Sequence, residues 1–134
     1  MVWLGEKKKR IAVPLLKELL TNDHPRKIRV QAIRTLGKIG DRSAVDGVMA
    51  ALSESDEEIL SAAVEALGRI GEPKAVVPLI NMLKHERVKL TAIWALGNIA
   101  DKRVVPILTS LLEDRDKFVR FNARRALKKI GDNG

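Results

Sequence analysis

The sequence contains no cysteine and no tyrosine, and its only histidines are His24 and His85. The absence of cysteine excludes a disulfide-stabilised fold, thiolate zinc sites and a cysteine nucleophile. Aromatic residues make up only 3% of the chain, so its core has to be built from aliphatic side chains and alanine. Such a core favours helices over a β-sandwich. No hydrophobic run approaches the roughly 18 residues that a membrane span requires.

The composition of the 134 residues, 46% hydrophobic and 31% charged, predicts a folded chain rather than a disordered one. The first ten residues place a Lys-Lys-Lys-Arg run after a short apolar patch, which is the reverse of a secretory signal peptide. We therefore expect a cytoplasmic protein with no membrane partner. The formal net charge of +8 makes the chain basic and favours anionic partners.

One phrase, typified by Leu-Gly-Lys-Ile-Gly-Asp, occurs four times along the chain. Its first residues, which we call the anchor leucines, are Leu36, Leu67, Leu96 and Leu127, spaced 31, 29 and 31 residues apart. A second phrase, typified by Val-Pro-Leu-Leu-x-x-Leu, precedes each copy. We therefore expect a single domain over residues 1–134 with a basic lead-in. The lead-in spans residues 1–10, and the repeats span about 11–41, 44–72, 75–101 and 103–132.

The positions around each anchor leucine have the periodicity of a helix. Apolar residues recur eight and four residues before the anchor and three after it, which places them on one stripe of a helix of roughly 14 residues. Gly40, Gly71 and Gly131 follow these stripes and are expected to take the left-handed conformation that ends a helix. The second phrase predicts a shorter helix with Pro14, Pro78 or Pro106 near its start.

Neither helix of such a pair buries its stripe alone, so stacked pairs have to form the core. The sequence therefore predicts an all-α fold, an α-solenoid of about four helical hairpins in a right-handed superhelix. The alanine four residues before each anchor and the glycine that follows the first three anchors are expected to let neighbouring helices approach closely. Examples are Ala63 and Gly68.

The combined phrases resemble HEAT repeats of the short phycobilisome-lyase-type class over about 120 residues. The resemblance implies a curved stack of helical hairpins that serves mainly as a protein-binding scaffold. Relatives of this class also include chromophore lyase subunits, DNA glycosylases and deoxyhypusine hydroxylase, so the fold alone does not determine the function.

The solvent-facing positions of the longer helices are the candidate binding surface, which in stacks of this family lines the concave side. Six residues before the anchor stand Val30, Ser61, Leu90 and Phe121. We expect an apolar centre flanked by cations, because an exposed aromatic among arginines commonly anchors a partner chain. The candidate partner-binding residues are Trp94, Leu90, Phe121, Arg34, Lys38, Arg69, Arg125 and Lys129.

Other repeated or substituted positions have structural explanations. Arg29, Lys89 and Arg120 stand seven before their anchors and are expected to reach acids between the helices, such as Asp23, Glu86 or Asp114; Leu60 interrupts this ladder. Arg124 and Lys128 replace the apolar residue and the glycine of the earlier repeats, which is typical of a C-terminal cap on a complete four-unit stack. Trp3 and Leu4 are expected to cover the other end, although self-association through Trp3 is an alternative.

Residues with catalytic chemistry are scarce. Deoxyhypusine hydroxylase ligates iron through several His-Glu dipeptides, but this chain has only His85-Glu86, placed in a turn between helices. No phosphate-binding glycine loop or Ser/His/Asp set is present. The sequence therefore predicts no metal, no cofactor and no enzyme activity.

The distribution of charge bears on the partner. Residues 1–43 hold 11 basic and 4 acidic side chains, whereas residues 44–74 hold 2 basic and 7 acidic ones. Because a phosphate track needs continuous positive charge, this acidic second repeat weakens the case for nucleic acid. We expect a scaffold that binds a protein partner, which could be acidic. The alternatives are nucleic-acid binding and an accessory role in a lyase or other enzyme.

Overall fold

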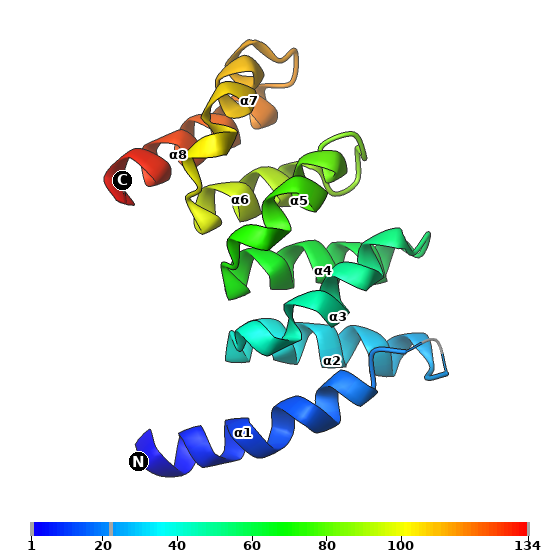
Figure 1. Cartoon of the computed structure of the whole chain (residues 1–134). Coiled ribbons are helices and arrows are strands. Elements are labelled where there is room, and N and C mark those ends of the chain that lie inside the picture. Colours follow the sequence, from blue (N-terminus) through cyan, green and yellow to red (C-terminus); the bar gives the residue numbers. More distant parts are fainter. Residues whose placement is uncertain (1, 22, 134) are drawn as a thin grey trace.

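The computed structural model describes the backbone of residues 2–21 and 23–133, and the side chains of residues 8–9, 11–21 and 23–132. Every regular element in that part of the chain is helical, so the predicted all-α solenoid is confirmed. Helical pairs follow one another along the stack (Figure 1). The helices are α1 Val2–Glu18, α2 Arg26–Ile39, α3 Val45–Ala50, α4 Glu57–Ile70, α5 Val76–Met82, α6 Lys89–Ile99, α7 Val105–Ser110 and α8 Lys117–Asn133.

The longer helices α2, α4, α6 and α8 pack side by side, and α3, α5 and α7 form the second layer. The second-layer helices are short, with 6, 7 and 6 residues, as the second phrase predicts. Short 3₁₀ turns extend them at Arg42–Ala44, Ala51–Ser53, Pro73–Ala75, Lys102–Val104 and Leu111–Glu113. Helix α1 differs, because it begins at Val2 and has 17 residues.

This start of α1 corrects one expectation. The helix includes the basic lead-in from Val2, so Pro14 lies inside it rather than near its first residue. Pro78 and Pro106 do lie in the first turns of α5 and α7, where a missing N–H is tolerated. The side chains of Trp3 and Leu4, expected to cover this end, lie outside the described part of the chain.

The repeated apolar stripe forms the core. The side chains of Leu36, Leu67 and Leu96 are fully buried, as are the alanines four residues before them. At Gly37 an added Cβ would lie 2.8 Å from Cα of Ala66, and at Gly97 it would lie 2.8 Å from Cα of Ala126. The predicted role of these small residues is thus confirmed, because a side chain at either glycine would push two neighbouring longer helices apart.

The helix ends follow the predicted pattern in part. Gly40 and Gly71 end α2 and α4 in the left-handed conformation, each with φ of 76°. In the third repeat Ala100 takes this conformation without the freedom of a glycine, with φ of 60°. The expectation for Gly131 was wrong, because α8 continues through it to Asn133.

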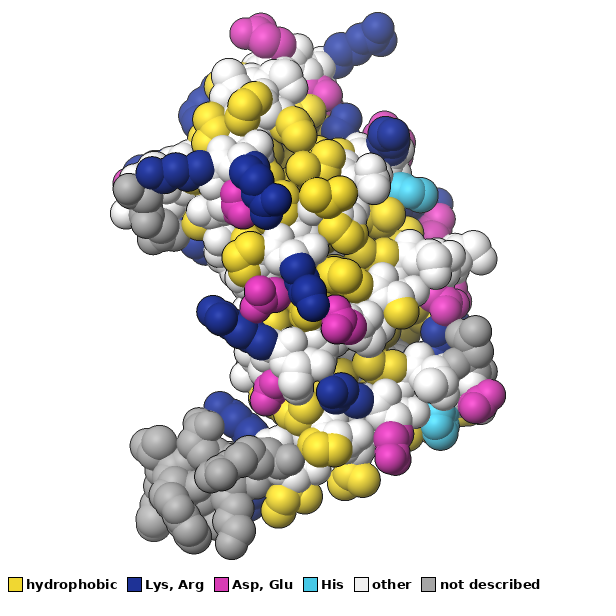
Figure 2. Space-filling model, viewed as in Figure 1, with side chains coloured by type: hydrophobic (Ala, Val, Ile, Leu, Met, Phe, Trp, Pro, Cys, Tyr) yellow, Lys and Arg dark blue, Asp and Glu magenta, His cyan; other side chains and the backbone are white. Residues whose placement is uncertain are grey.

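Hydrophobic side chains are not confined to the core. Figure 2 shows them gathered in a band that runs along the stack on the face viewed in Figure 1. Val77 on α5, for example, is 59% exposed. None of the described helices combines the length and hydrophobicity that a membrane span requires.

Candidate functional site

The exposed faces of α4, α6 and α8 form a groove around Trp94. Its main part is an open depression of about 420 Å³, and a smaller one of about 90 Å³ adjoins it through Trp94 and Asn122. Together we call them the Trp94 groove. The larger part is lined by Glu65, Arg69, Leu90, Thr91, Trp94 and Asn122, and the smaller adds Gly97, Arg125, Ala126 and Lys129.

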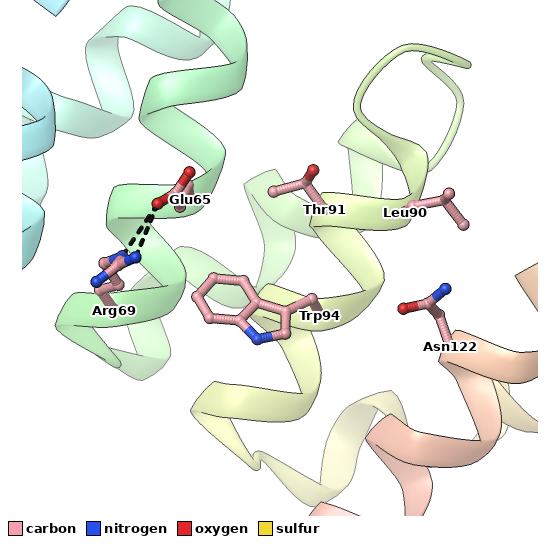
Figure 3. A pocket seen from close by; sticks show the side chains of 6 residues that line it. All are labelled: Glu65, Arg69, Leu90, Thr91, Trp94 and Asn122. Atoms are coloured by element: carbon pink, nitrogen blue, oxygen red, sulfur yellow. Dashed lines mark hydrogen bonds and ion pairs between the residues drawn. The ribbon is translucent and has the colours of Figure 1, made fainter. Parts of the chain in front are cut away.

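Trp94 occupies the centre of this groove because of its helix register. It stands two residues before the buried Leu96, and its ring extends from α6 toward α4 (Figure 3). There it lies against Gly68, where an added Cβ would come within 2.6 Å of Cζ3 of Trp94. The glycine thus provides the space in which the six-membered ring of the indole approaches α4, while 37% of the residue stays exposed.

Polar contacts hold the walls of the groove in place. Arg69 donates to Glu65 one turn earlier on α4, with 3.0 Å between Nη2 and Oε2. The side-chain amide of Asn98 donates to the carbonyl of Gly68 at 2.9 Å, and Lys129 donates to Asn98 in turn. Because these contacts link α4, α6 and α8, the groove is a preformed surface rather than a loop-built one.

The structure brings together five of the eight sequence-predicted residues. Trp94, Leu90, Arg69, Arg125 and Lys129 all line the Trp94 groove. The other three lie elsewhere. Arg34 and Lys38 are exposed on α2 and line no part of the groove, and Phe121 lines a separate depression at the end of the stack.

The register also placed two further residues on the solvent-facing side, Val30 six before its anchor and Ala62 five before its anchor, and both placements were wrong. Val30 is 3% exposed, and Ala62 is 1% exposed. The exposure of these positions changes along the stack, since the residue six before the anchor is buried in the first repeat and open at Leu90 and Phe121. A uniform helical register could not show this gradient.

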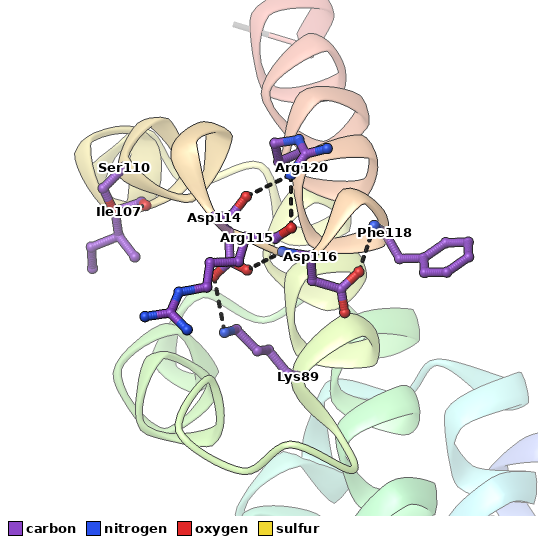
Figure 4. A network of polar contacts seen from close by, with 8 residues as sticks. All are labelled: Lys89, Ile107, Ser110, Asp114, Arg115, Asp116, Phe118 and Arg120. Atoms are coloured by element: carbon purple, nitrogen blue, oxygen red, sulfur yellow. Dashed lines mark hydrogen bonds and ion pairs between the residues drawn. The ribbon is translucent and has the colours of Figure 1, made fainter.

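The ladder of cations connects one repeat to the next. Nη2 of Arg29 lies 2.8 Å from Oε2 of Glu54, and Nζ of Lys89 lies 3.3 Å from Oδ2 of Asp114. The structural role is therefore confirmed, although the partner of Arg29 is Glu54 and not Asp23. Arg120 departs from the pattern, because it donates to the carbonyls of Asp114 and Arg115 in its own turn (Figure 4).

Backbone and side-chain donors stabilise the charged form of several turn carboxylates. The side chain of Arg103, followed by its backbone N–H, holds the pKa of Asp101 below its usual value. The side-chain and backbone donors of Ser43 lower the pKa of Asp41 in the same way. The backbone N–H of Asp116 lowers the pKa of Asp114, and Lys89 contributes further. These carboxylates begin the turns that lead into new helices, so their roles are structural.

Sequence reasoning missed Phe118, which is 57% exposed at the start of α8. The equivalent positions of the earlier repeats are Lys27, Glu58 and Arg87, so an aromatic residue stands where the other three repeats have a charged one. This departure from the repeat pattern is the sequence signal that identifies Phe118.

The residues present do not fit an iron site of the His-Glu type. His85 and Glu86 are exposed in the turn between α5 and α6. Among the side chains that the structure describes, no three or more histidine and carboxylate groups lie where they could hold a metal ion.

Comparison with known proteins relates this fold to a repeat family. The family model for HEAT repeats matches residues 12–88 and 78–134. Deoxyhypusine hydroxylase of Eremothecium gossypii is 32% identical over 120 residues, which cover 86% of this chain and 37% of that enzyme. The bilin biosynthesis protein PecE of Mastigocladus laminosus is 33% identical over 92 residues, covering 63% of this chain and 34% of that protein. The chain thus spans about a third of the length of these relatives.

A solved structure matches nearly the whole chain. It is the complex of CpcE and CpcF of phycocyanin lyase from Nostoc sp. PCC7120, with a TM-score of 0.79 and 26% identity. The match covers 97% of this chain and 57% of that one. These relatives point to an enzymatic or enzyme-associated function, so the expectation that the chain is not an enzyme is corrected.

Proposed function

Because the chain belongs to the HEAT-repeat family, we propose that it is a component of an enzyme assembly and binds a protein partner of that assembly in the Trp94 groove. The accessory role in a lyase or other enzyme, a lesser alternative on sequence grounds, becomes the leading one. The match to a structure described as a complex of two lyase subunits supports a protein partner.

The observation that carries this proposal is the exposed, preformed position of Trp94. A flat aromatic ring held against Gly68 loses little conformational freedom on binding, which is a property of residues that dominate protein interfaces. Leu90, 39% exposed on the same helix, extends the apolar surface by one turn. A partner segment that buries both side chains gains from the removal of apolar area from water.

The polar groups of the groove define what that segment would carry. Arg69 is already paired with the carboxylate of Glu65, whereas Lys129 is hydrogen-bonded to the amide of Asn98, which does not neutralise its charge. Arg125 lies with its Cζ 5.7 Å from the centroid of the Phe121 ring and has no carboxylate partner among the described residues. We therefore propose that the partner presents an apolar side chain to Trp94 and an acidic group to Arg125.

The same pairing weakens the nucleic-acid alternative. Glu65 stands at the position that Arg34 and Arg125 occupy in other repeats, and it neutralises Arg69 within the groove. A groove that binds a phosphate backbone needs several uncompensated cations along its length.

Photocross-linking in cells of the source organism tests the proposal. A photoreactive amino acid at Thr91, inside the groove, should cross-link one enzyme subunit. The same residue at Val77 on α5 serves as the control and should not cross-link it. Equal cross-linking from both positions, cross-linking to nucleic acid, or no cross-linked protein from Thr91 would contradict the proposal.

A further inference from the structure

A second exposed apolar surface lies at the far end of the stack, on α8. Its depression of about 520 Å³ is lined by Lys117, Phe118, Arg120, Phe121 and Arg124, which we call the α8 end surface. Phe118 and Phe121 are 57% and 52% exposed, and Figure 4 shows Phe118 directed away from the helix. Two phenylalanines three residues apart lie on one side of a helix and form a continuous apolar strip.

This surface does not suit another repeat of the kind that forms the stack. Inside the stack, the neighbouring longer helix packs so closely on one glycine of each pair that an added Cβ would overlap its backbone. These glycines are Gly37, Gly68 and Gly97. The equivalent residue of α8 is Lys128, which is exposed. Arg124 likewise stands where the earlier repeats have a buried aliphatic residue. A helix that docks on α8 must therefore lie farther away and meet positive charge.

A second copy of this chain is also a poor fit. Its opposite end is formed by α1 and α2, which carry exposed cations at Lys8, Lys17 and Lys27. Stacking that end on the α8 end surface would bring like charges together, which costs free energy.

The cations of α8 are available to an acidic partner. Lys117 lies with its Nζ 5.4 Å from the centroid of the Phe118 ring. No carboxylate among the described side chains lies within ion-pair distance of Lys117, Arg124 or Lys128. Asp116, next to the surface, accepts the backbone N–H of Phe118 at 2.7 Å and so caps α8. The surface thus combines an apolar strip with unpaired cations along one edge.

We propose that the α8 end surface binds an acidic amphipathic helix of a partner chain. Apolar residues spaced three and four apart on that helix would cover Phe118 and Phe121. Its Asp or Glu residues would pair with Lys117, Arg124 and Lys128, giving charge-assisted hydrogen bonds at the edge of an apolar contact. The surface shares no lining residue with the Trp94 groove, although Arg125 of the groove lies over the ring of Phe121. Arg124→Glu leaves that contact in place and therefore tests this proposal separately.

A displayed library of helical peptides tests this inference. Each peptide has about 18 residues, or five helical turns, with both faces randomised. The library is first depleted on the Phe118→Ser/Phe121→Ser double variant, so that only peptides that need this surface remain. Selection on the full chain at about 150 mM salt should then enrich peptides with apolar residues at helical spacing and flanking acids.

Point variants complete the test. Arg124→Glu should weaken the selected peptides about tenfold, whereas Val77→Ser, which alters another exposed apolar side chain, should leave their affinity unchanged. Circular dichroism checks that the double variant stays folded. No enrichment, or peptides without acidic residues, would overturn the proposal. A dimer that dissociates in the double variant would assign the surface to a second copy, and duplex DNA binding abolished by Arg124→Glu would assign it to nucleic acid.

Discussion

The indole of Trp94 occupies the space that a side chain at Gly68 would need. An added Cβ there would lie 2.6 Å from Cζ3 of Trp94 and 2.8 Å from Cα of Ala95. The carbonyl of Gly68 also accepts a hydrogen bond from the side-chain amide of Asn98. One glycine therefore joins the packing of α4 on α6 to the position of the exposed ring, so the repeat pattern and the candidate site are physically coupled.

Gly68→Ala should lower the free energy of unfolding by about 1–3 kcal/mol, because the new methyl group meets backbone atoms that cannot move freely. In a Trp3→Phe background the variant should also shift the emission of Trp94. Urea unfolding followed by fluorescence measures both effects. Gly131→Ala is the matched control, since no atom lies within 4 Å of the added Cβ and α8 continues through this residue. Equal stability of the Gly68 variant and wild type would contradict this packing.

Ala100→Gly should stabilise the protein by about 1 kcal/mol, because a non-glycine residue in the left-handed conformation is strained. The φ of Ala100 is 60°, close to the 76° of Gly71 at the same place in the preceding repeat. Thermal unfolding of both Ala100→Gly and Gly71→Ala measures the effect. The two variants should shift the midpoint in opposite directions, and shifts of the same sign would show that the left-handed conformation is not the cause.

Removing Glu54 should cost more stability than removing Glu72. The side chain of Arg29, the partner of Glu54, is 9% exposed, so Glu54→Ala leaves a buried guanidinium without its carboxylate. We expect a loss of about 1–3 kcal/mol. Arg42, the partner of Glu72, is 77% exposed, and Glu72→Ala should cost under about 1 kcal/mol. Similar losses in denaturant titrations of the two variants would contradict the structural role of the ladder.

The protein should lose stability in acid partly through Asp101 and Asp41. Hydrogen bonds to both carboxylates lower their pKa in the folded state, so the folded protein binds fewer protons than the unfolded chain. Their contribution is present above the unfolded pKa and is lost as the pH falls below about 4. The Asp101→Asn variant should have a lower melting temperature than wild type at neutral pH, and its melting temperature should fall less than that of wild type on acidification. A difference in melting temperature between the two proteins that stays constant at every pH would contradict this assignment.

The repeats could be predicted in detail because equivalent residues make equivalent packing contacts in successive helical pairs. Each anchor leucine and each small residue recurs at a position that meets the same neighbour in the next pair, so four weak signals reinforce one another. The start of α1 and the end of α8 could not be predicted, since neither Pro14 nor Gly131 lies where the pattern of the inner repeats places it.

The candidate site was predictable only in part. The register of Trp94 and Leu90 follows from the anchor leucine, but their distance from Phe121 depends on how α6 and α8 are placed in space. The pairing of Arg69 with Glu65 follows an ordinary four-residue spacing, whereas the contact between Lys129 and Asn98 joins two repeats. A helical register identifies the candidate face of each helix, whereas packing between the repeats decides which residues of that face are exposed and which of them meet.

We propose that Trp94 anchors a protein partner from an enzyme assembly. The dissociation constant of the subunit cross-linked through Thr91, compared by titration calorimetry among wild type, Trp94→Ala and Val77→Ala, tests this role of Trp94. Trp94→Ala should weaken binding by about tenfold or more with the fold intact, and Val77→Ala should leave it unchanged. Equal affinities of the folded Trp94→Ala variant and wild type would show that Trp94 does not anchor the partner.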